Sequence, residues 1–246
     1  MKAVAIIPAR WGSRRFPGKV ASPIAGQSMI ERVWRAARQC PRLRDVIVAT
    51  DDRRIATLCE GFGAKAVMTS GTHATGTDRI AEVASTLEDA LVVNIQGDEP
   101  LIESRVIDAA LDALEADPEA RMATVVHPLE AGALGDENRV KVWLDAQNRA
   151  VDFARHVSPQ DLLNPPYWQH VGLYVYPRHY LLEFVERPRS HNEIDRDLEQ
   201  WRALDQGHSI AVGKVEGWQS VPVDVPADIA RVEALLIRSS SVAEGS

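Results

Sequence analysis

The feature that most constrains the fold is an alternation, through the first half of the chain, of short apolar runs and amphipathic segments. The apolar runs are short enough for buried strands and fall at Val4–Ile7, Val46–Ala49, Ala66–Met68, Leu91–Ile95 and Met122–Val126. Apolar residues recur at helical spacing in three of the intervening segments, near residues 30–37, 80–87 and 107–114. Continuous apolar strands joined by helices predict a mostly parallel sheet with helices on both faces.

The pattern changes after about residue 130, where strands follow one another without long helices between them. The expected strands are "RVKVWLD" (139–145), "RAVDFAR" (149–155) and "HVGLYVYP" (170–177). Helices near Arg178–Val185 and Glu193–Leu204 come next, then a strand at Ile210–Val215 and a helix from Pro226 to about Arg238. The whole pattern predicts an α/β fold with a mostly parallel, doubly wound, Rossmann-like sheet and a smaller antiparallel β excursion in the second half.

The length of 246 residues suits one large domain. We expect this single domain to cover residues 1–238 and to include the excursion at about residues 130–215. Residues 239–246, "SSSVAEGS", are expected to form a frayed tail.

Composition excludes several classes of partner. The net charge of −7, from 28 Lys and Arg against 35 Asp and Glu, argues against nucleic acid, which needs a basic face. Cys40 and Cys59, the only cysteines, have no metal-ligand spacing; they fit a reducing compartment, and we expect a cytoplasmic protein. No apolar run is long enough for a signal segment or a bilayer span, so no membrane partner is expected.

The stretch "IPARWGSRRFPGK", from Ile7 to Lys19, places Arg10, Arg14, Arg15 and Lys19 directly after the first apolar run. Its glycines match neither the phosphate-binding loop nor the G-x-G-x-x-G dinucleotide fingerprint, which disfavours a hydride-transferring Rossmann enzyme. One interpretation is a solvated basic loop. The cations are better explained by a polyanion, such as a nucleoside triphosphate, bound at the carboxyl edge of the sheet.

Two acidic motifs also follow expected strands, "TDD" at Thr50–Asp52 and "QGDEP" at Gln96–Pro100. Ligands of open α/β sheets bind outside the carboxyl ends of the strands. Asp98 follows Gly97 at such an end, so its carboxylate can reach a bound ligand. Carboxylate and phosphate oxygens are ligands that Mg²⁺ prefers, which makes Asp98 a candidate magnesium ligand.

These motifs, in their order along the chain, resemble the signatures of sugar nucleotidyltransferases that use CTP, and most closely the 3-deoxy-manno-octulosonate cytidylyltransferase family. The other segments that carry the resemblance are "VATDD" (48–52), "THATGTDRIAEV" (72–83), "VVNIQGDEP" (92–100), "VKVWLD" (140–145), "FAR" (153–155), "HVGLYVY" (170–176), "LEQWRAL" (198–204) and "VDVPADI" (223–229). The resemblance implies a nucleotidyltransferase fold and transfer of CMP from CTP to an acid sugar. A hydroxyl of the acceptor attacks the α-phosphorus, and pyrophosphate leaves.

The resemblance also implies roles for residues around the triphosphate. Arg10 and Lys19 match positions that hold it and stabilise the departing pyrophosphate, and Arg15 shares that work. With Arg10 and Lys19, Asp98 is an expected catalytic residue. Asp98 and Asp224 match the two carboxylates that hold Mg²⁺. The alternative for Asp224 is a helix N-cap before Pro226.

The segment "ATGTDR" matches the part of the family that reads cytosine. The implied nucleotide contacts are Thr75, Gly76, Arg79 and Gln96, where Gly76 permits close approach of the backbone. Thr77 and Asp78 are equally well explained as an ordinary helix cap.

The resemblance places the acid acceptor against the later strands. Arg155, His170, Tyr174 and Glu199 match acceptor-binding positions, and an Arg is the natural bidentate partner of a carboxylate. Residues about 130–215 are the expected acceptor-binding portion, and we also expect homodimerisation through this portion.

This chain departs from the family pattern at Arg196, where an acid is usual, at Trp201, where Leu is usual, and at Val225, where Thr is usual. Arg196 could answer a more anionic acceptor, so a sialic-like acid, an amino-sugar acid or a small phosphonate stays open as the alternative. A nucleotide-binding protein without catalytic activity is a further alternative, disfavoured because Arg10, Lys19, Asp98 and Asp224 are all present.

Overall fold

The computed structural model describes residues 2–13, 15–130, 132–159, 161–163 and 168–243. Contacts within the chain group into two compact units. The N-terminal unit comprises Val4–Leu87, Asn94–Ser104 and Ser220–Ser246, and the central unit comprises Met1–Ala3, Glu88–Val93 and Arg105–Gln219. The expected single domain over residues 1–238 stays a prediction.

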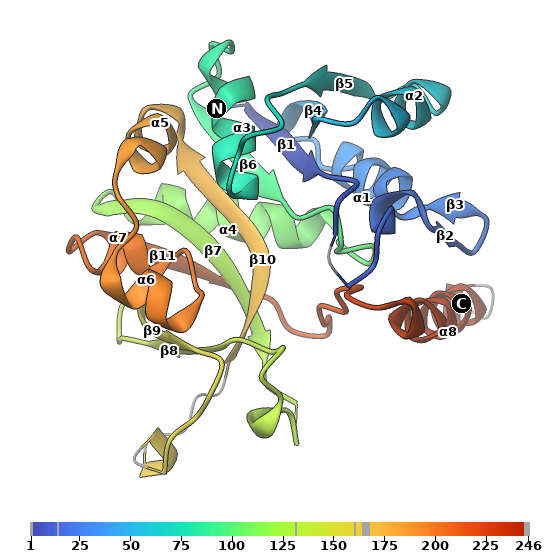
Figure 1. Cartoon of the computed structure of the whole chain (residues 1–246). Coiled ribbons are helices and arrows are strands. Elements are labelled where there is room, and N and C mark those ends of the chain that lie inside the picture. The colour runs from blue at the N-terminus through green and yellow to red at the C-terminus, as the bar shows by residue number, and fades with distance from the viewer. Residues whose placement is uncertain (1, 14, 131, 160, 164–167, 244–246) are drawn as a thin grey trace. The chain divides into compact units, whose positions relative to one another are not determined.

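The N-terminal unit is built on the strand order β6-β1-β4-β5 (Figure 1). These strands are β6 (Leu91–Ile95), β1 (Ala3–Ala9), β4 (Leu43–Thr50) and β5 (Lys65–Met68), and the boundary between the units runs through β1 and β6. β4 and β5 pair in parallel. β6 is buried along its whole length and β1 almost so, as their continuous apolar runs predict.

The helices of this unit are α1 (Met29–Arg38), α2 (Arg53–Gly61), α3 (Gly76–Ser85) and α8 (Pro226–Ala243). α8 lies beside a small hairpin of β2 (Pro23–Ile24) and β3 (Gln27–Ser28), where Glu233 accepts a hydrogen bond from the backbone of Ala25 at 2.8 Å (Figure 1). α8 also extends past its expected end at about Arg238, because no Pro or Gly interrupts the chain before Gly245.

The central unit has the strand order β11-β7-β10-β6, and the antiparallel excursion of β8 and β9 is attached to β10. Its remaining strands are β7 (Ala120–Pro128), β8 (Lys141–Leu144), β9 (Ala150–Ala154), β10 (Trp168–Pro177) and β11 (Ser209–Lys214). β7 pairs with β11 in parallel and with β10 antiparallel. The predicted α/β class, with mostly parallel strands and a small antiparallel portion, is confirmed.

The helices of the central unit are α4 (Ser104–Ala116), α5 (Arg178–Glu186), α6 (His191–Arg196) and α7 (Trp201–Leu204). The single helix expected at Glu193–Leu204 is wrong. Asp197 takes a left-handed conformation, with φ 51° and ψ 47°, which ends α6 and lets α7 start in a new direction. Within the ranges described above, no helix is both long and apolar enough to cross a membrane.

Candidate functional site

The loop after β1 is folded by its own backbone. The carbonyl of Trp11 accepts hydrogen bonds from the amides of Ser13 and Gly18, each at 2.9 Å. Gly18 has φ +71°, and a Cβ there would lie 3.1 Å from the Trp11 ring, so this turn requires glycine. A 3₁₀ turn, Lys19–Ala21, begins immediately after Gly18 and fixes the start of the Lys19 side chain.

Lys19 lies between two carboxylates that are far apart in the sequence. Its Nζ is 2.7 Å from an oxygen of Asp98 and 3.6 Å from an oxygen of Asp224. Arg15 forms a second ion pair with Asp224, at 2.8 Å. The predicted grouping of Arg15, Lys19, Asp98 and Asp224 is therefore present in the fold.

Asp224 reaches this cluster because its neighbours are anchored. Val221 and Val223 are buried against Ile24 and Met29, and the Val223 amide donates to the Asp98 carbonyl at 2.9 Å. The alternative role of Asp224 as a helix N-cap is not supported, since α8 begins two residues later, at Pro226, and the Asp224 carboxylate pairs with Arg15 and Lys19. The Asp224 carboxylate is thus available to face Lys19 and Arg15.

A cavity opens beside Lys19 and Asp98, between the end of β1 and the start of α3. It is lined by Pro8, Ala9, Arg10, Ser13, Lys19, Val20, His73, Ala74, Thr75, Gly76, Arg79, Gln96, Gly97 and Asp98. This set contains every predicted nucleotide contact except Arg15, which is paired with Asp224. Residues from three separate sequence motifs thus meet in one concave site.

Arg10 is the exposed cation of this cavity. Its guanidinium forms no hydrogen bond or ion pair with any residue that the structure describes. A cation of this kind can bind an incoming anion without first breaking an ion pair. Arg14, the remaining cation of this stretch, lies outside the described residues.

The start of α3 forms the opposite wall. Thr75 is the N-cap and Asp78 the third helical residue of a reciprocal capping box, with hydrogen bonds of 2.9 and 3.1 Å. The helix-cap interpretation is therefore confirmed for Asp78, with Thr75 rather than Thr77 as its partner. A Cβ at Gly76 would lie 3.2 Å from Pro8, so glycine lets the start of the helix approach the end of β1.

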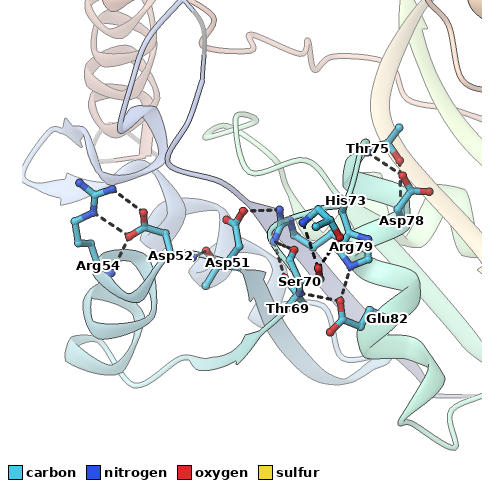
Figure 2. A network of polar contacts seen from close by, with 12 residues as sticks. Asp51, Asp52, Arg54, Thr69, Ser70, His73, Thr75, Asp78, Arg79 and Glu82 are labelled. Atoms are coloured by element: carbon cyan, nitrogen blue, oxygen red, sulfur yellow. Dashed lines mark hydrogen bonds and ion pairs between the residues drawn. The ribbon is translucent and has the colours of Figure 1, made fainter.

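Arg79 is buried at the centre of the polar network in Figure 2. It pairs with Asp51 at 3.0 Å and donates to the Thr69 hydroxyl at 2.5 Å and the Ser70 carbonyl at 3.4 Å. His73, nearby in the same view, is hydrogen-bonded to Glu82, and this contact lowers the pKa of the Glu82 carboxyl. The network fixes residues 69–73 along the edge of the cavity.

The predicted acceptor residues meet in the central unit. The rings of His170 and Tyr174 are 5.2 Å apart on β10, which confirms that they share one face. The positive charge of Arg155 acts on both rings, and the negative charge of Glu199 acts on Tyr174. Burial raises the pKa of the Tyr174 hydroxyl, so this group stays protonated.

Arg155 and Glu199 are held in different ways. Among the residues that the structure describes, Arg155 donates only to neutral partners, the carbonyls of Glu137 and Asp197, at 3.4 and 3.3 Å. Within the described residues no carboxylate neutralises Arg155, which leaves its charge for an acid ligand. Glu199 lies 3.7 Å from Arg202, whose closer partner is the buried Glu193 at 2.6 Å.

Arg196 and Trp201, two departures from the family pattern, contact each other. The guanidinium of Arg196 lies 4.3 Å from the centre of the Trp201 ring and pairs with Asp152 at 3.0 Å. Trp201 in turn donates to the carbonyl of Phe153 at 2.9 Å. Arg196 is thus neutralised and stacked within the protein, and the suggestion that it answers a more anionic acceptor is not supported.

Sequence reasoning missed several residues at these sites. His73 lines the cavity but was not among the predicted site residues. Gln200 is buried next to Tyr174, whose hydroxyl donates to it at 3.3 Å, and its Nε2 has no hydrogen-bond partner in the described part of the chain. Its position beside Glu199 in "LEQWRAL" was the available signal.

The donor set fits a hard divalent cation. Asp98 and Asp224 supply carboxylate oxygens about one ammonium group, so the site already accommodates positive charge between them. Magnesium usually takes one or two protein carboxylates and completes its shell with phosphate oxygens and water. Three or more His, Cys, Asp or Glu side chains grouped for a metal are not found among the described residues.

Comparison with known proteins identifies the class. The sequence model of the cytidylyltransferase family matches residues 4–211. A solved structure of CMP:2-keto-3-deoxy-manno-octonic acid synthetase complexed with CTP superposes with a TM-score of 0.90 at 37% identity, covering 97% of this chain and 100% of that one. Fold and site together define a cytidylyltransferase, a nucleotidyltransferase that uses CTP.

Curated relatives narrow the class to a family. The 3-deoxy-manno-octulosonate cytidylyltransferases of Solibacter usitatus and Myxococcus xanthus are 42% and 44% identical to this chain. The first alignment covers 99% of this chain and 97% of the relative, and the second covers 96% of each. The chain belongs to the 3-deoxy-manno-octulosonate cytidylyltransferase family.

A more distant structure shares the fold alone. The 4-diphosphocytidyl-2C-methyl-D-erythritol synthase of Anaerococcus prevotii is 13% identical and superposes with a TM-score of 0.63 over 96% of both chains.

The titration of His170 tests whether its imidazole ring is buried in the central unit as the structure shows. Burial, and to a smaller extent the Arg155 cation, lowers the pKa of His170 from 6.5 to about 3. Below about pH 6.5 His170 is protonated in the unfolded chain but stays neutral in the folded protein. The free energy of unfolding therefore decreases as the pH falls from about 6.5 toward 3, by at most about 1.4 kcal/mol per pH unit. We expect the NMR signals of the ring to stay those of neutral imidazole from pH 8 to pH 5. A midpoint near 6.5 would contradict the buried environment.

Proposed function

We propose that this protein transfers CMP from CTP to 3-deoxy-manno-octulosonate and releases pyrophosphate. The observation that carries the proposal is the cluster of Lys19, Asp98 and Asp224 beside a cavity with the free cation Arg10. The named activity of full-length relatives at 42% identity or more supports the acceptor. The self-contained packing of Arg196 also favours the acid sugar over a more anionic alternative.

In the proposed reaction a hydroxyl oxygen of the acceptor forms a bond to the α-phosphorus of CTP. The bond from that phosphorus to the bridging oxygen breaks, the hydroxyl proton passes to solvent, and pyrophosphate leaves. This chemistry depends on positioning and charge neutralisation more than on covalent help from the protein. Arg10, Arg15 and Lys19 supply the positive charge for the triphosphate and for the leaving pyrophosphate.

Asp98 and Asp224 are the proposed ligands of Mg²⁺. When bound, the metal polarises the α-phosphate and lowers the pKa of the attacking hydroxyl. In the absence of nucleotide, the ammonium group of Lys19 neutralises the carboxylates of Asp98 and Asp224. When CTP binds, this ammonium group can pair with a phosphate instead, which leaves the carboxylates to the metal. Binding of CTP and of the metal should therefore favour each other.

The pyrimidine is proposed to lie against Thr75, Gly76, Arg79 and Gln96, which line the same cavity. Arg155, His170, Tyr174 and Glu199 are proposed to bind the acid sugar. The cation of Arg155, which has only carbonyl partners in the described part of the chain, suits the carboxylate of the acid sugar.

We also propose a cytoplasmic homodimer. The two buried free cysteines, Cys40 and Cys59, suit a reducing compartment. Exposed apolar side chains of Val151 on β9 and Ile194 on α6 supply candidate contacts for a second copy. Light scattering during gel filtration tests this part, and a mass of one chain would reject it.

A panel of acceptors tests the proposed function. Pyrophosphate release is followed with CTP, MgCl₂ and, in turn, 3-deoxy-manno-octulosonate, a sialic acid and a small phosphonate. We expect turnover with the first acid at a kcat/KM at least about a hundredfold above the others. Strong turnover of the phosphonate with none of the acid sugar would reverse the assignment.

A further inference from the structure

Thr124 lies where the pairing of β7 and β10 is interrupted. Val171 pairs with Val125 and Tyr174 with Thr124, so residues 172 and 173 form an irregularity between these two pairs. The Thr124 side chain is fully buried there. Its hydroxyl donates to the carbonyl of Leu173 at 2.7 Å, a group that can only accept.

The hydrogen bond from Thr124 to Leu173 determines which atom is the donor in a second hydrogen bond, between Thr124 and His170. The same hydroxyl lies 2.9 Å from Nε2 of His170. A threonine hydroxyl has one proton, and here it is used on Leu173. Thr124 must then accept from His170, so the imidazole proton sits on Nε2.

The other ring nitrogen is consequently an acceptor. Phe153 packs edge-on against the ring at 5.5 Å and Tyr174 lies 5.2 Å away, which fixes the plane of the imidazole. Nδ1 has no hydrogen bond to any residue described by the structure. Burial, and to a smaller extent the charge of Arg155, lowers the pKa of this ring, so the lone pair of Nδ1 stays available.

We propose that Thr124 is a positioning residue that fixes the Nε2–H tautomer of His170, so that Nδ1 accepts a hydrogen bond from a hydroxyl of the acceptor. This inference rests on the proposed acceptor site. On this proposal, two functional groups of the acid sugar are bound by two different residues. The carboxylate of the sugar can only accept hydrogen bonds, and Arg155 donates to it. A hydroxyl of the sugar can donate, and Nδ1 of His170 accepts from it.

The tautomer is measured without substrate. In ¹⁵N-labelled protein at pH 7, long-range ¹H–¹⁵N correlation spectra separate protonated from unprotonated ring nitrogens, and a His170→Asn variant assigns the signals. We expect Nε2 of His170 to be protonated and Nδ1 to be unprotonated. A proton on Nδ1, or on both nitrogens, would overturn the proposal, and this result needs no Thr124 variant to fold.

Two variants then test the role of Thr124. Thr124→Val keeps the shape of the side chain and removes the hydroxyl, whereas Thr124→Ser keeps the hydroxyl. We expect Thr124→Val to mix the tautomers and raise the KM for the acid sugar by about tenfold, with an unchanged KM for CTP. Thr124→Ser should restore the single tautomer and a KM within about twofold of the native value.

These experiments distinguish failure of the positioning role of Thr124 from failure of the proposed function. A native Nε2–H tautomer that stays pure in Thr124→Val would overturn the positioning role, as would an unchanged KM in a variant whose tautomers are mixed. If the native tautomer is as expected but no acid sugar is turned over in the panel, the proposed function fails while the assignment of the His170 proton stands.

Discussion

Replacement of Asp98 by Asn is expected to lower kcat for CMP transfer by at least about a thousandfold, because the amide keeps the size of the side chain and removes its charge. Asp98 lies at the end of β6, next to Lys19 and close enough to the segment of Asp224 for their backbones to be hydrogen-bonded. The neutral amide is a poor ligand for Mg²⁺, so charge neutralisation at the α-phosphate is lost together with the metal.

The matched control is Glu88→Gln, which makes the same chemical change at an exposed position. Circular dichroism and thermal melts verify that both variants are folded, and pyrophosphate release with saturating CTP and acid sugar measures kcat. The control should retain native activity. If Asp98→Asn stayed within tenfold of the native enzyme, Asp98 would have no place in the metal site.

Removal of the Lys19 ammonium group is expected to have the second-largest effect. Lys19→Met keeps most of the side-chain length and should reduce kcat/KM for CTP by roughly a hundredfold to a thousandfold, the usual cost of losing a charged group that stabilises a transition state. Because this ammonium group lies at 2.7 and 3.6 Å from the two carboxylates, its loss also leaves them facing each other without their cation.

This second consequence gives Lys19→Met an unusual signature. Without nucleotide, Mg²⁺ should stabilise the variant against heat more than it stabilises the native protein, since the metal no longer competes with Lys19. Lys65→Met, at an exposed position on β5, is the control and should behave as the native protein does. An equal rise in melting temperature in all three proteins would show that Lys19 and the metal do not share these carboxylates.

The strands and their terminal motifs could be predicted because each depends on local information. A continuous apolar run predicts a buried strand, and the polar residues that follow it must lie at the sheet edge. This was enough to bring Lys19 and Asp98 toward one edge of the sheet, whereas Arg79 was expected at the nucleotide site only through the resemblance to a family. The resemblance to a family was needed for Asp224, whose position depends on its neighbours Val221 and Val223. These pack against Ile24, about two hundred residues earlier in the sequence.

Other features depend on tertiary contacts that no local pattern reveals. α2 was not predicted, since only Ile55 and Cys59 of its residues are buried and its start depends on the cap by Asp52. The break at Asp197 interrupts a sequence that otherwise suits one helix. The stacking of Arg196 on Trp201 could not be seen either, because each residue looked like a separate departure from the family pattern.

The most direct test of the account is a calorimetric titration of the protein with CTP, with and without MgCl₂. The central claim is that Arg10, Arg15 and Lys19 bind the triphosphate opposite Asp98 and Asp224, which hold the metal. It predicts an affinity for CTP at least about tenfold higher with magnesium, a gain of about 1.4 kcal/mol in coupling free energy that Asp98→Asn abolishes. No binding of CTP, or the same affinity with and without magnesium, would contradict the claim.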